Sequence, residues 1–309
     1  MSKKNNLGIS YGVLSGMFWG LDTVLTGFIL SITPFISNEK AILIAPIISA
    51  FLHDILSSFW MMLFLGVKKE LTKTIKLLKT KSARYVAIAA LFGGPIGMGA
   101  YLLAISYLGA GYTASISAVY PAVGAFFSYI FLKEKLSIKG WIGLSISILA
   151  IIILGYTPGG EVDSKFFVGF VFAHVCVLGW SLESVICAYG MKDDEINPEQ
   201  ALQIRQLVSG ITYGIIIIPI ISGIELTKIV IQSNILSFII ITALIGTLSY
   251  IFYYRAIDSI GPVKATGLNV TYSIWAIIFE ILFVGNEITL KLVICAILII
   301  IGSTMVSKD

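Results

Sequence analysis

The sequence predicts an all-α integral membrane protein with ten transmembrane helices, and three observations support this. Of its 309 residues, 57% are hydrophobic and only 12% are charged, and the mean hydropathy is +0.96. Soluble domains carry about 25% charged residues, so this chain has too little polar surface to cover a water-soluble domain. The apolar residues come in runs of about twenty, the length that a helix needs to cross the hydrocarbon core. The third observation is an internal repeat, described below.

The apolar runs place the expected helices at residues 8–32, 42–66, 84–107, 111–132, 138–156, 166–191, 199–221, 235–257, 263–284 and 289–306. The seventh has the clearest start. Asn197 is a candidate N-cap, Pro198 fits the first helical position, and Glu199 favours the positive end of the helix dipole.

Basic residues gather on one side of this arrangement. That side carries Lys3, Lys4, Lys68, Lys69, Lys73, Lys76, Lys79, Lys81, Arg84, Lys133, Lys135, Lys139, Lys192, Arg255, Lys264 and Lys308. The other side has Lys40, Lys165, Lys228 and Lys291. By the positive-inside rule, both termini are predicted to be cytoplasmic.

Three segments recur in the second half of the chain. Trp19–Thr23 (WGLDT) resembles Trp180–Ser184 (WSLES), at an offset of 161 residues. Tyr101–Gly109 resembles Tyr253–Gly261, and Leu136–Lys139 resembles Ile288–Lys291, both at an offset of 152 residues. Because each half holds an odd number of helices, the halves are expected to cross the membrane in opposite orientations, as 1–158 and 163–309. Such inverted repeats hold a substrate site near the midplane, between the halves.

Ionisable residues in a spanning helix need a partner or a water-filled cavity. The candidates are Asp22, His53, Asp54, Glu183, Arg205, Arg255 and Glu280. Arg255 and Glu280 lie near helix ends, where snorkelling to the interface is the preferred interpretation. Arg205 fits either snorkelling or a bond to a carboxylate such as Asp54. His53 fits either a proton relay or a hydrogen-bonded core histidine.

Aromatic side chains accompany these carboxylates. Trp180 lies three residues before Glu183, and the repeat gives Trp19 and Asp22 the same relation. The second half adds Tyr250, Tyr253 and Tyr254 on one expected helix and Asn269, Tyr272 and Trp275 on the next; Tyr101 is the repeat counterpart of Tyr253. Aromatic stripes are more often packing or interface anchors, but aromatic faces with a buried carboxylate suit an organic cation.

Several other classes of function lack support. The three cysteines, Cys176, Cys187 and Cys295, lie inside hydrophobic runs and are interpreted as packing residues. No Cys/His cluster has metal-ligand spacing, and neither a P-loop nor a nucleophile–base signature is present. The sequence therefore predicts no metal, no cofactor and no enzyme activity.

Taken together, these residues resemble the drug/metabolite transporter superfamily in its EamA branch. Tyr120–Gly143 (YPAVGAFFSYIFLKEKLSIKGWIG) is similar to that branch's segment across the fourth and fifth helices. More narrowly, the chain resembles LicB-type choline permeases of phosphocholine-decorating bacteria. The similar segments are His53–Asp54, Gly94–Met98, Ser117–Pro121, Trp180–Val185, Ile204–Gln206 and Lys264–Val270.

The resemblance implies a multi-pass protein of the bacterial cytoplasmic membrane that imports choline. It assigns substrate binding to aromatic residues and one glutamate, here Trp19, Trp180, Glu183 and the tyrosines of 235–257. Asp22 departs from the family pattern, so the resemblance does not determine whether substrate specificity and proton coupling are the same as in the family. We expect a monomer or weak homodimer with no nucleic-acid partner.

Two alternatives compete with choline import. Many relatives in the superfamily export amino acids or other metabolites, and the fold does not fix the substrate. The second alternative is a non-transporting scaffold or sensor, but such a protein has no evident use for buried carboxylates. Transport coupled to protons and potential-driven uniport are both open.

Overall fold

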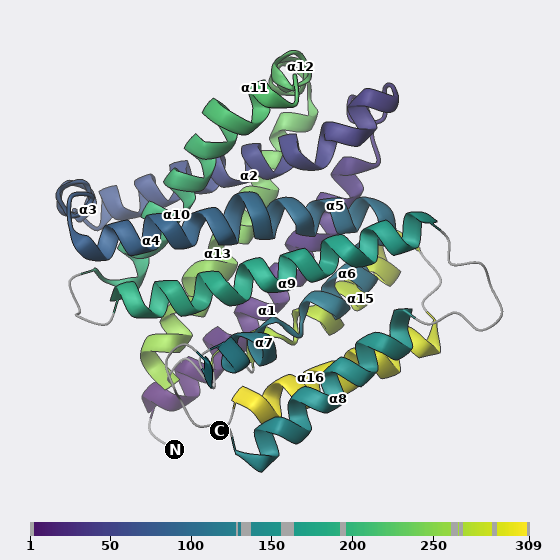
Figure 1. Ribbon diagram of the computed structural model, residues 1–309. Helices are drawn as coiled ribbons and strands as arrows, with labels where there is room; N and C mark the ends of the chain where they lie inside the picture. Colours follow the sequence, from purple (N-terminus) through teal and green to yellow (C-terminus); the bar gives the residue numbers. More distant parts are fainter. Residues whose placement is uncertain are drawn as a thin grey trace.

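The computed structural model describes residues 3–127, 129–130, 137–155, 164–191, 196–260, 265, 268–285 and 289–307, and all regular secondary structure in them is helical (Figure 1). The first half contains α1 (Lys3–Leu30), α2 (Glu39–Val67), α3 (Leu71–Leu77), α4 (Lys81–Leu91), the π-helical η1 (Phe92–Met98), α5 (Gly99–Leu108), α6 (Ala110–Ser117), α7 (Tyr120–Phe127) and α8 (Ile138–Gly155). The second half contains α9 (Ser164–Met191), α10 (Pro198–Thr212), the π-helical η3 (Tyr213–Ile217), α11 (Ile218–Ile220), α12 (Ile224–Gln232), α13 (Ile235–Ile260), α15 (Tyr272–Phe283) and α16 (Leu290–Ser307).

Every range expected to be a membrane helix contains helix in the part of the chain that the structure describes. Six helical stretches there are long and apolar enough to cross a bilayer: Asn6–Leu30, Glu39–Val67, Lys81–Leu108, Ser164–Cys187, Pro198–Ile220 and Ile235–Ala256. Shorter apolar helices cover Ile138–Ala150, Tyr272–Phe283 and Leu290–Gly302. The total of ten spans stays a prediction. The start expected at Asn197 is confirmed, with Asn197 and Gln200 forming a reciprocal capping box.

The short helices α3 and α12 were not expected. In α12, Leu226 and Val230 are buried while Ile224 and Ile229 are exposed. A short amphipathic helix has both apolar and polar residues, so its mean hydropathy is moderate. A search for long apolar runs therefore does not detect it. The same reason applies to α3, whose lysines interrupt its apolar residues.

Two prolines coincide with breaks in regular α-helix. Pro95 lies in the π-helical η1, which joins α4 to α5. Pro121 lies at the second position of α7, directly after the turn that ends α6. Proline cannot donate the backbone bond of a regular helix interior, which is consistent with both breaks, whereas Pro46 lies inside the continuous helix α2.

The helices of the two halves pack mainly on each other. Helix α1 packs on α13 and α15, whereas α9 packs on α4, η1, α5, α6 and α7. Helices α2 and α10 pack together, as do α8 and α16. If each helix is replaced by its repeat counterpart in the other half, every pairing named here becomes another pairing that the structure also shows. The start of α1, the end of α16 and helix α3 all lie toward the left side of Figure 1.

Small residues allow the close approach of α1 to the second half. A Cβ atom added at Gly20 would lie 2.7 Å from Trp275 Cβ and 2.8 Å from the Ala276 backbone nitrogen. At Gly16 it would lie 2.9 Å from the carbonyl oxygen of Asn269. These distances are too short for any side chain, so the glycines bring α1 against the segment that includes α15.

Candidate functional site

Five aromatic rings meet in the buried centre of the protein, and we refer to them as the aromatic cluster. The Trp19 ring of α1 has centroid distances of 5.2 Å to Tyr250, 5.7 Å to Trp180 and 6.1 Å to Tyr101. The Trp180 ring of α9 lies 4.9 Å from Tyr101 and 5.7 Å from Tyr120. The cluster thus joins α1, α5 and α7 of the first half to α9 and α13 of the second.

Hydrogen bonds fix the orientation of these rings. The Trp180 indole donates to the carbonyl oxygen of Gly93 at 3.2 Å, and the hydroxyls of Tyr101 and Thr23 share a hydrogen bond of 2.7 Å. A Cβ atom added at Gly97 would lie 2.6 Å from Trp180 Cδ1. The glycines of η1 therefore provide both the space and an acceptor for the Trp180 ring.

A polar chain continues from the edge of the cluster. The Tyr120 hydroxyl donates to Asn269 Oδ1 at 3.3 Å, and Asn269 Nδ2 donates to Ser15 Oγ at 3.0 Å. Tyr272 shares a hydrogen bond of 2.8 Å with Ser117. These contacts join α7 and α6 of the first half to the segment around α15, so Asn269 and Tyr272 act on helix association as well as on the site.

A second group of side chains, the charged network, connects α1, α2, α10 and α9. His53 Nε2 lies 3.1 Å from Asp22 Oδ1, and His53 Nδ1 lies 3.5 Å from Asp54 Oδ1. Arg205 Nη1 donates to Asp54 Oδ1 at 3.1 Å, and Arg205 Nε donates to Glu183 Oε1 at 2.9 Å. Three carboxylates thus face one arginine and one histidine, so with all three ionised the network is net negative whether or not His53 is protonated.

The charged network and the aromatic cluster meet at Tyr250. The guanidinium carbon of Arg205 lies 5.5 Å from the centroid of the Tyr250 ring, which is within cation–π distance. The same guanidinium donates from Nη1 to Gln206 Oε1 at 2.8 Å, and the Ser209 hydroxyl donates to Asp54 Oδ2 at 2.5 Å. The two groups are therefore one continuous site.

The structure bears on several of the alternatives left by the sequence. Arg205 does not snorkel, because only 1% of its side chain is exposed and it binds two carboxylates. His53 is hydrogen-bonded to Asp22 in the core, an arrangement that fits both a core histidine and a proton relay. Glu280 was expected to snorkel, and that was wrong: it is buried and accepts a hydrogen bond from the backbone nitrogen of Gly111 at 2.7 Å. This carboxylate satisfies an otherwise free N–H at the start of α6.

Arg255 lies at the end of α13, as expected, with its Nε 3.8 Å from Glu199 Oε1. Lys68, at the end of α2, binds the same carboxylate, with both oxygens of Glu199 at 2.8 Å. Lys133, Lys135, Lys192, Lys264 and Lys308, which were also used to predict the orientation, lie outside the described residues.

Trp19 and Trp180, which the resemblance assigns to substrate binding, leave no space for a ligand between their rings in this conformation. Their rings contact each other in an edge-on arrangement. A cation held between two ring faces has to separate the rings, and rings in contact leave no such gap. The rings fill the space that a ligand between them would need.

The tyrosines of α13 lie close to the centre of the protein. Tyr250 joins the aromatic cluster, and both Tyr250 and Tyr254 pack against the buried group Met61, Leu65, Leu202 and Ile251. Tyr253 and Tyr254 have ring centroids 6.0 Å apart. These three residues were expected on one helix, and each side of a long helix contacts several neighbouring helices along its length.

Tyr120 and Ser209 were missed as members of the site. Tyr120 directly precedes Pro121, a position that marks a helix break and lets a side chain turn inward. Ser209 lies four residues after Arg205, on the same face of α10. Both signals were present in the sequence. Neither residue is acidic or basic, so a search for charged residues within the membrane helices did not select them.

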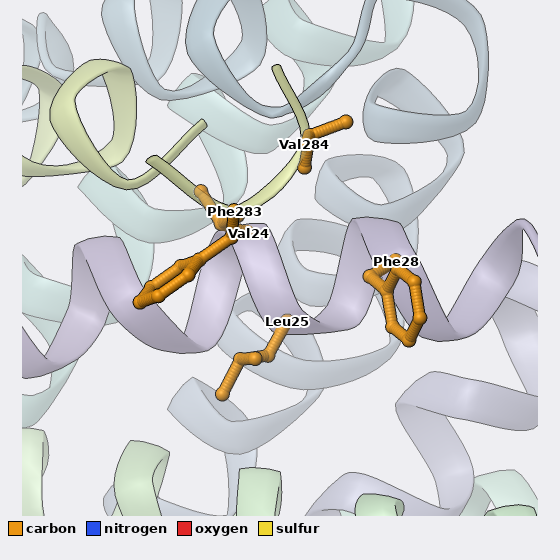
Figure 2. A pocket seen from close by; sticks show the side chains of 5 residues that line it. All are labelled: Val24, Leu25, Phe28, Phe283 and Val284. Atoms are coloured by element: carbon orange, nitrogen blue, oxygen red, sulfur yellow. The ribbon is translucent and has the colours of Figure 1, made fainter. Parts of the chain in front are cut away.

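A separate apolar pocket lies between α1 and the end of α15 (Figure 2). It is lined by Val24, Leu25, Phe28, Phe283 and Val284, of which Phe28, Phe283 and Val284 are largely exposed. The lining carries no charged side chain, so it gives an ionic ligand nothing to bind. Within the described ranges, no group of three or more His, Cys, Asp or Glu residues is arranged to hold a metal ion.

Comparisons with known proteins were consistent with this arrangement. Residues 6–156 and 167–308 match the EamA-like transporter family. The protein LicB of Haemophilus influenzae is 34% identical over 279 residues, which cover 87% of each chain. One solved crystal structure aligns with a TM-score of 0.57 over 96% of this chain and 95% of its own, at 15% identity, which supports the fold alone. The protein is a multi-pass membrane protein, and the chain belongs to the EamA-like transporter family.

Proposed function

We propose that the protein is a secondary transporter that imports choline or a related quaternary ammonium cation by alternating access. The observation that carries this proposal is the aromatic cluster, which adjoins a network of three carboxylates, one arginine and one histidine. A quaternary ammonium has no N–H to donate, so its recognition depends on ring faces and on a nearby negative charge. An anionic substrate would meet the carboxylates with repulsion. The resemblance to LicB-type permeases supports the same substrate.

Substrate binding, in this proposal, separates rings that are now in contact. Trp19 and Tyr250 come from one pair of packed helices, and Trp180 and Tyr101 from another. A relative movement of these helix pairs would open a space bounded by aromatic faces. The cation would then approach Glu183, whose side chain is 18% exposed, more readily than the buried Asp54.

The proposed architecture has ten membrane spans in two inverted repeats, residues 1–158 and 163–309, with both termini cytoplasmic. The exchange of helix pairings between the halves supports it, as does the match of the family to each half separately. With this orientation, an inside-negative potential favours entry of a cation by about 2.3 kcal/mol per charge per 100 mV. The potential therefore supports import as the direction of transport.

The test is binding of choline by the purified protein in detergent, measured against a panel of amino acids. Wild type is expected to bind choline and not the amino acids. Glu183→Gln removes the charge and keeps the shape, and should weaken choline binding by about tenfold to a hundredfold, as expected for a buried charge contact. Glu225→Gln, on the exposed face of α12, is the matched control and should bind like wild type. Preferential binding of an amino acid would contradict the proposal.

Proton coupling is a separate part of this proposal, based on the surplus of carboxylates. If Asp22 or Glu183 takes up and releases a proton in each cycle, choline uptake should acidify proteoliposomes held at zero membrane potential. A pH-sensitive dye inside the vesicles gives the measurement. Uptake without acidification would indicate a potential-driven uniporter instead.

A further inference from the structure

Arg205 already occupies the contacts that a cationic substrate would need. Its Nε donates to Glu183, and its guanidinium carbon lies 5.5 Å from the Tyr250 ring centroid. A carboxylate and an aromatic face are the two groups that a soft cation requires. In the arrangement described here, both are engaged by a side chain of the protein itself.

Arg205 also has a second set of partners that does not involve Glu183. Its Nη1 donates to Asp54 at 3.1 Å and to Gln206 at 2.8 Å. Asp54 is buried and also accepts from Ser209, so this end of the guanidinium is firmly held. The arginine could release Glu183 and still keep a charged partner.

The two carboxylates on Arg205 differ in exposure. The Glu183 side chain is 18% exposed, whereas those of Asp54 and Arg205 are each 1% exposed. Of the two, Glu183 is the one that a molecule entering from outside would meet. Moreover, Nη2 of Arg205 has no hydrogen-bond partner within the described residues, so the guanidinium has an unused donor with which to form another bond.

We propose that Arg205 is an internal competitor of the substrate: it binds Glu183 when no substrate is present and gives up that carboxylate when the cation binds. This inference rests on the proposed function, because it assumes a cationic substrate at Glu183. Exchange of one cation for another keeps the charge around Glu183 balanced at each step. Neither an unpaired Glu183 nor an unpaired Arg205 then has to be buried in the membrane, which would be costly.

The proposal fixes the direction of a mutational effect. Lysine keeps the positive charge of Arg205 but lacks the fork that lets a guanidinium bind Asp54 and Glu183 together. Arg205→Lys should therefore free Glu183 and tighten choline binding about tenfold to a hundredfold, the range expected for loss of one competing charged hydrogen bond. The dissociation constant is measured by titration of the purified protein in detergent. Arg84→Lys, on the exposed surface of α4, is the matched control and should leave binding unchanged.

A double-mutant cycle separates competition from other effects. In a Glu183→Gln background, Arg205→Lys should no longer tighten choline binding, since the carboxylate under competition is absent. If Arg205→Lys weakens binding or leaves it unchanged in the otherwise wild-type protein, Arg205 positions Glu183 and the proposal is overturned. If wild type itself binds no quaternary ammonium, the proposed function fails first, and that result is distinguishable from the other two.

A second measurement does not depend on the folding of any Arg205 variant. The protein contains only three arginines, Arg84, Arg205 and Arg255. With ¹⁵N-labelled arginine, Arg84→Lys and Arg255→Lys identify two Nε–H signals in NMR spectra, and the third belongs to Arg205. Saturating choline should move the Arg205 signal and leave the Arg84 signal in place. An Arg205 signal that stays unchanged at saturation would overturn the proposal.

Discussion

Individual residues decide what the centre of this protein can bind. Trp19 and Trp180 occupy matching positions in the repeated segments, and their rings lie in contact at the point where the two halves meet. Each also contacts Tyr101, which comes from a third helix. A ring in such a position serves either as packing or as a face for a cation, and substitutions can distinguish these roles.

We expect Trp180→Phe to weaken choline binding less than Trp180→Leu. Phenylalanine keeps a ring quadrupole, although a weaker one, whereas leucine keeps only bulk. If a desolvated face contributes about 2 kcal/mol, its loss costs about thirtyfold in affinity. Titration of both variants, and of the same pair at Trp19, gives the comparison. Equal losses for phenylalanine and leucine would identify the tryptophans as packing residues.

The sequence predicted some members of the site and not their contacts. Asp22, Asp54 and Glu183 stood out because a carboxylate in an apolar run is rare. A bond from Arg205 to Asp54 was one of the two alternatives for that arginine. The contacts of His53 with Asp22 and of Arg205 with Glu183 could not be predicted, because they depend on the order and rotation of four helices. Glu280 was misjudged for the same reason: its partner, the backbone of Gly111, is 169 residues away and carries no sequence signal.

At the scale of helices, the close contact between α9 and η1 depends on glycine. A Cβ atom added at Gly179 would lie 2.7 Å from the Phe92 carbonyl oxygen and 2.9 Å from Gly97 Cα. Both are backbone atoms, which cannot rotate away as a side chain can. This contact also sets the position of Trp180, the next residue in α9.

Gly179→Ala should therefore destabilise the protein by about 1–3 kcal/mol, as overpacking typically does. Gly66→Ala is the matched control, because nothing lies within 4 Å of a Cβ atom at Gly66 in α2. The control should melt like wild type or slightly above it, since alanine is the better helix former. Thermal unfolding in detergent gives both values. A Gly179→Ala protein that melts like wild type would show that α9 and η1 can separate at little cost.

Helix positions were easier to predict than helix packing. An apolar run long enough to span the bilayer has few alternatives to a helix, because every backbone polar group must be satisfied within the segment. The breaks at Pro95 and Pro121 are consistent with the chemistry of proline, but Pro46 is accommodated inside the continuous helix α2. The contacts of Tyr250 with Trp19 and Arg205 depend on neighbouring helices and have no signature in α13 itself.

For the whole molecule, the distribution of lysine predicts the orientation in the membrane. Both termini and the segment 68–84 should be cytoplasmic, and the start of α1, the end of α16 and helix α3 lie toward one side in Figure 1. A fluorescent reporter fused to the C-terminus should be active, and a periplasmic enzyme reporter there should be inactive. The opposite result is expected for reporters fused after Ser233, which follows α12. Activity of the periplasmic reporter at the C-terminus would contradict the orientation.

The packing of α1 on α13 and α15 has a consequence for biogenesis. The ribosome synthesises α1 long before it reaches Ile235, where α13 begins. Helix α1 is therefore inserted in the bilayer before its main neighbours exist. A lone carboxylate at the centre of a helix raises the free energy of insertion by about 2.5–3.5 kcal/mol. His53, on the very next helix, supplies a partner for Asp22 as soon as α2 is inserted. The pair α1 and α2 can thus provide a hydrogen-bond partner for Asp22 before the second half of the chain is synthesised.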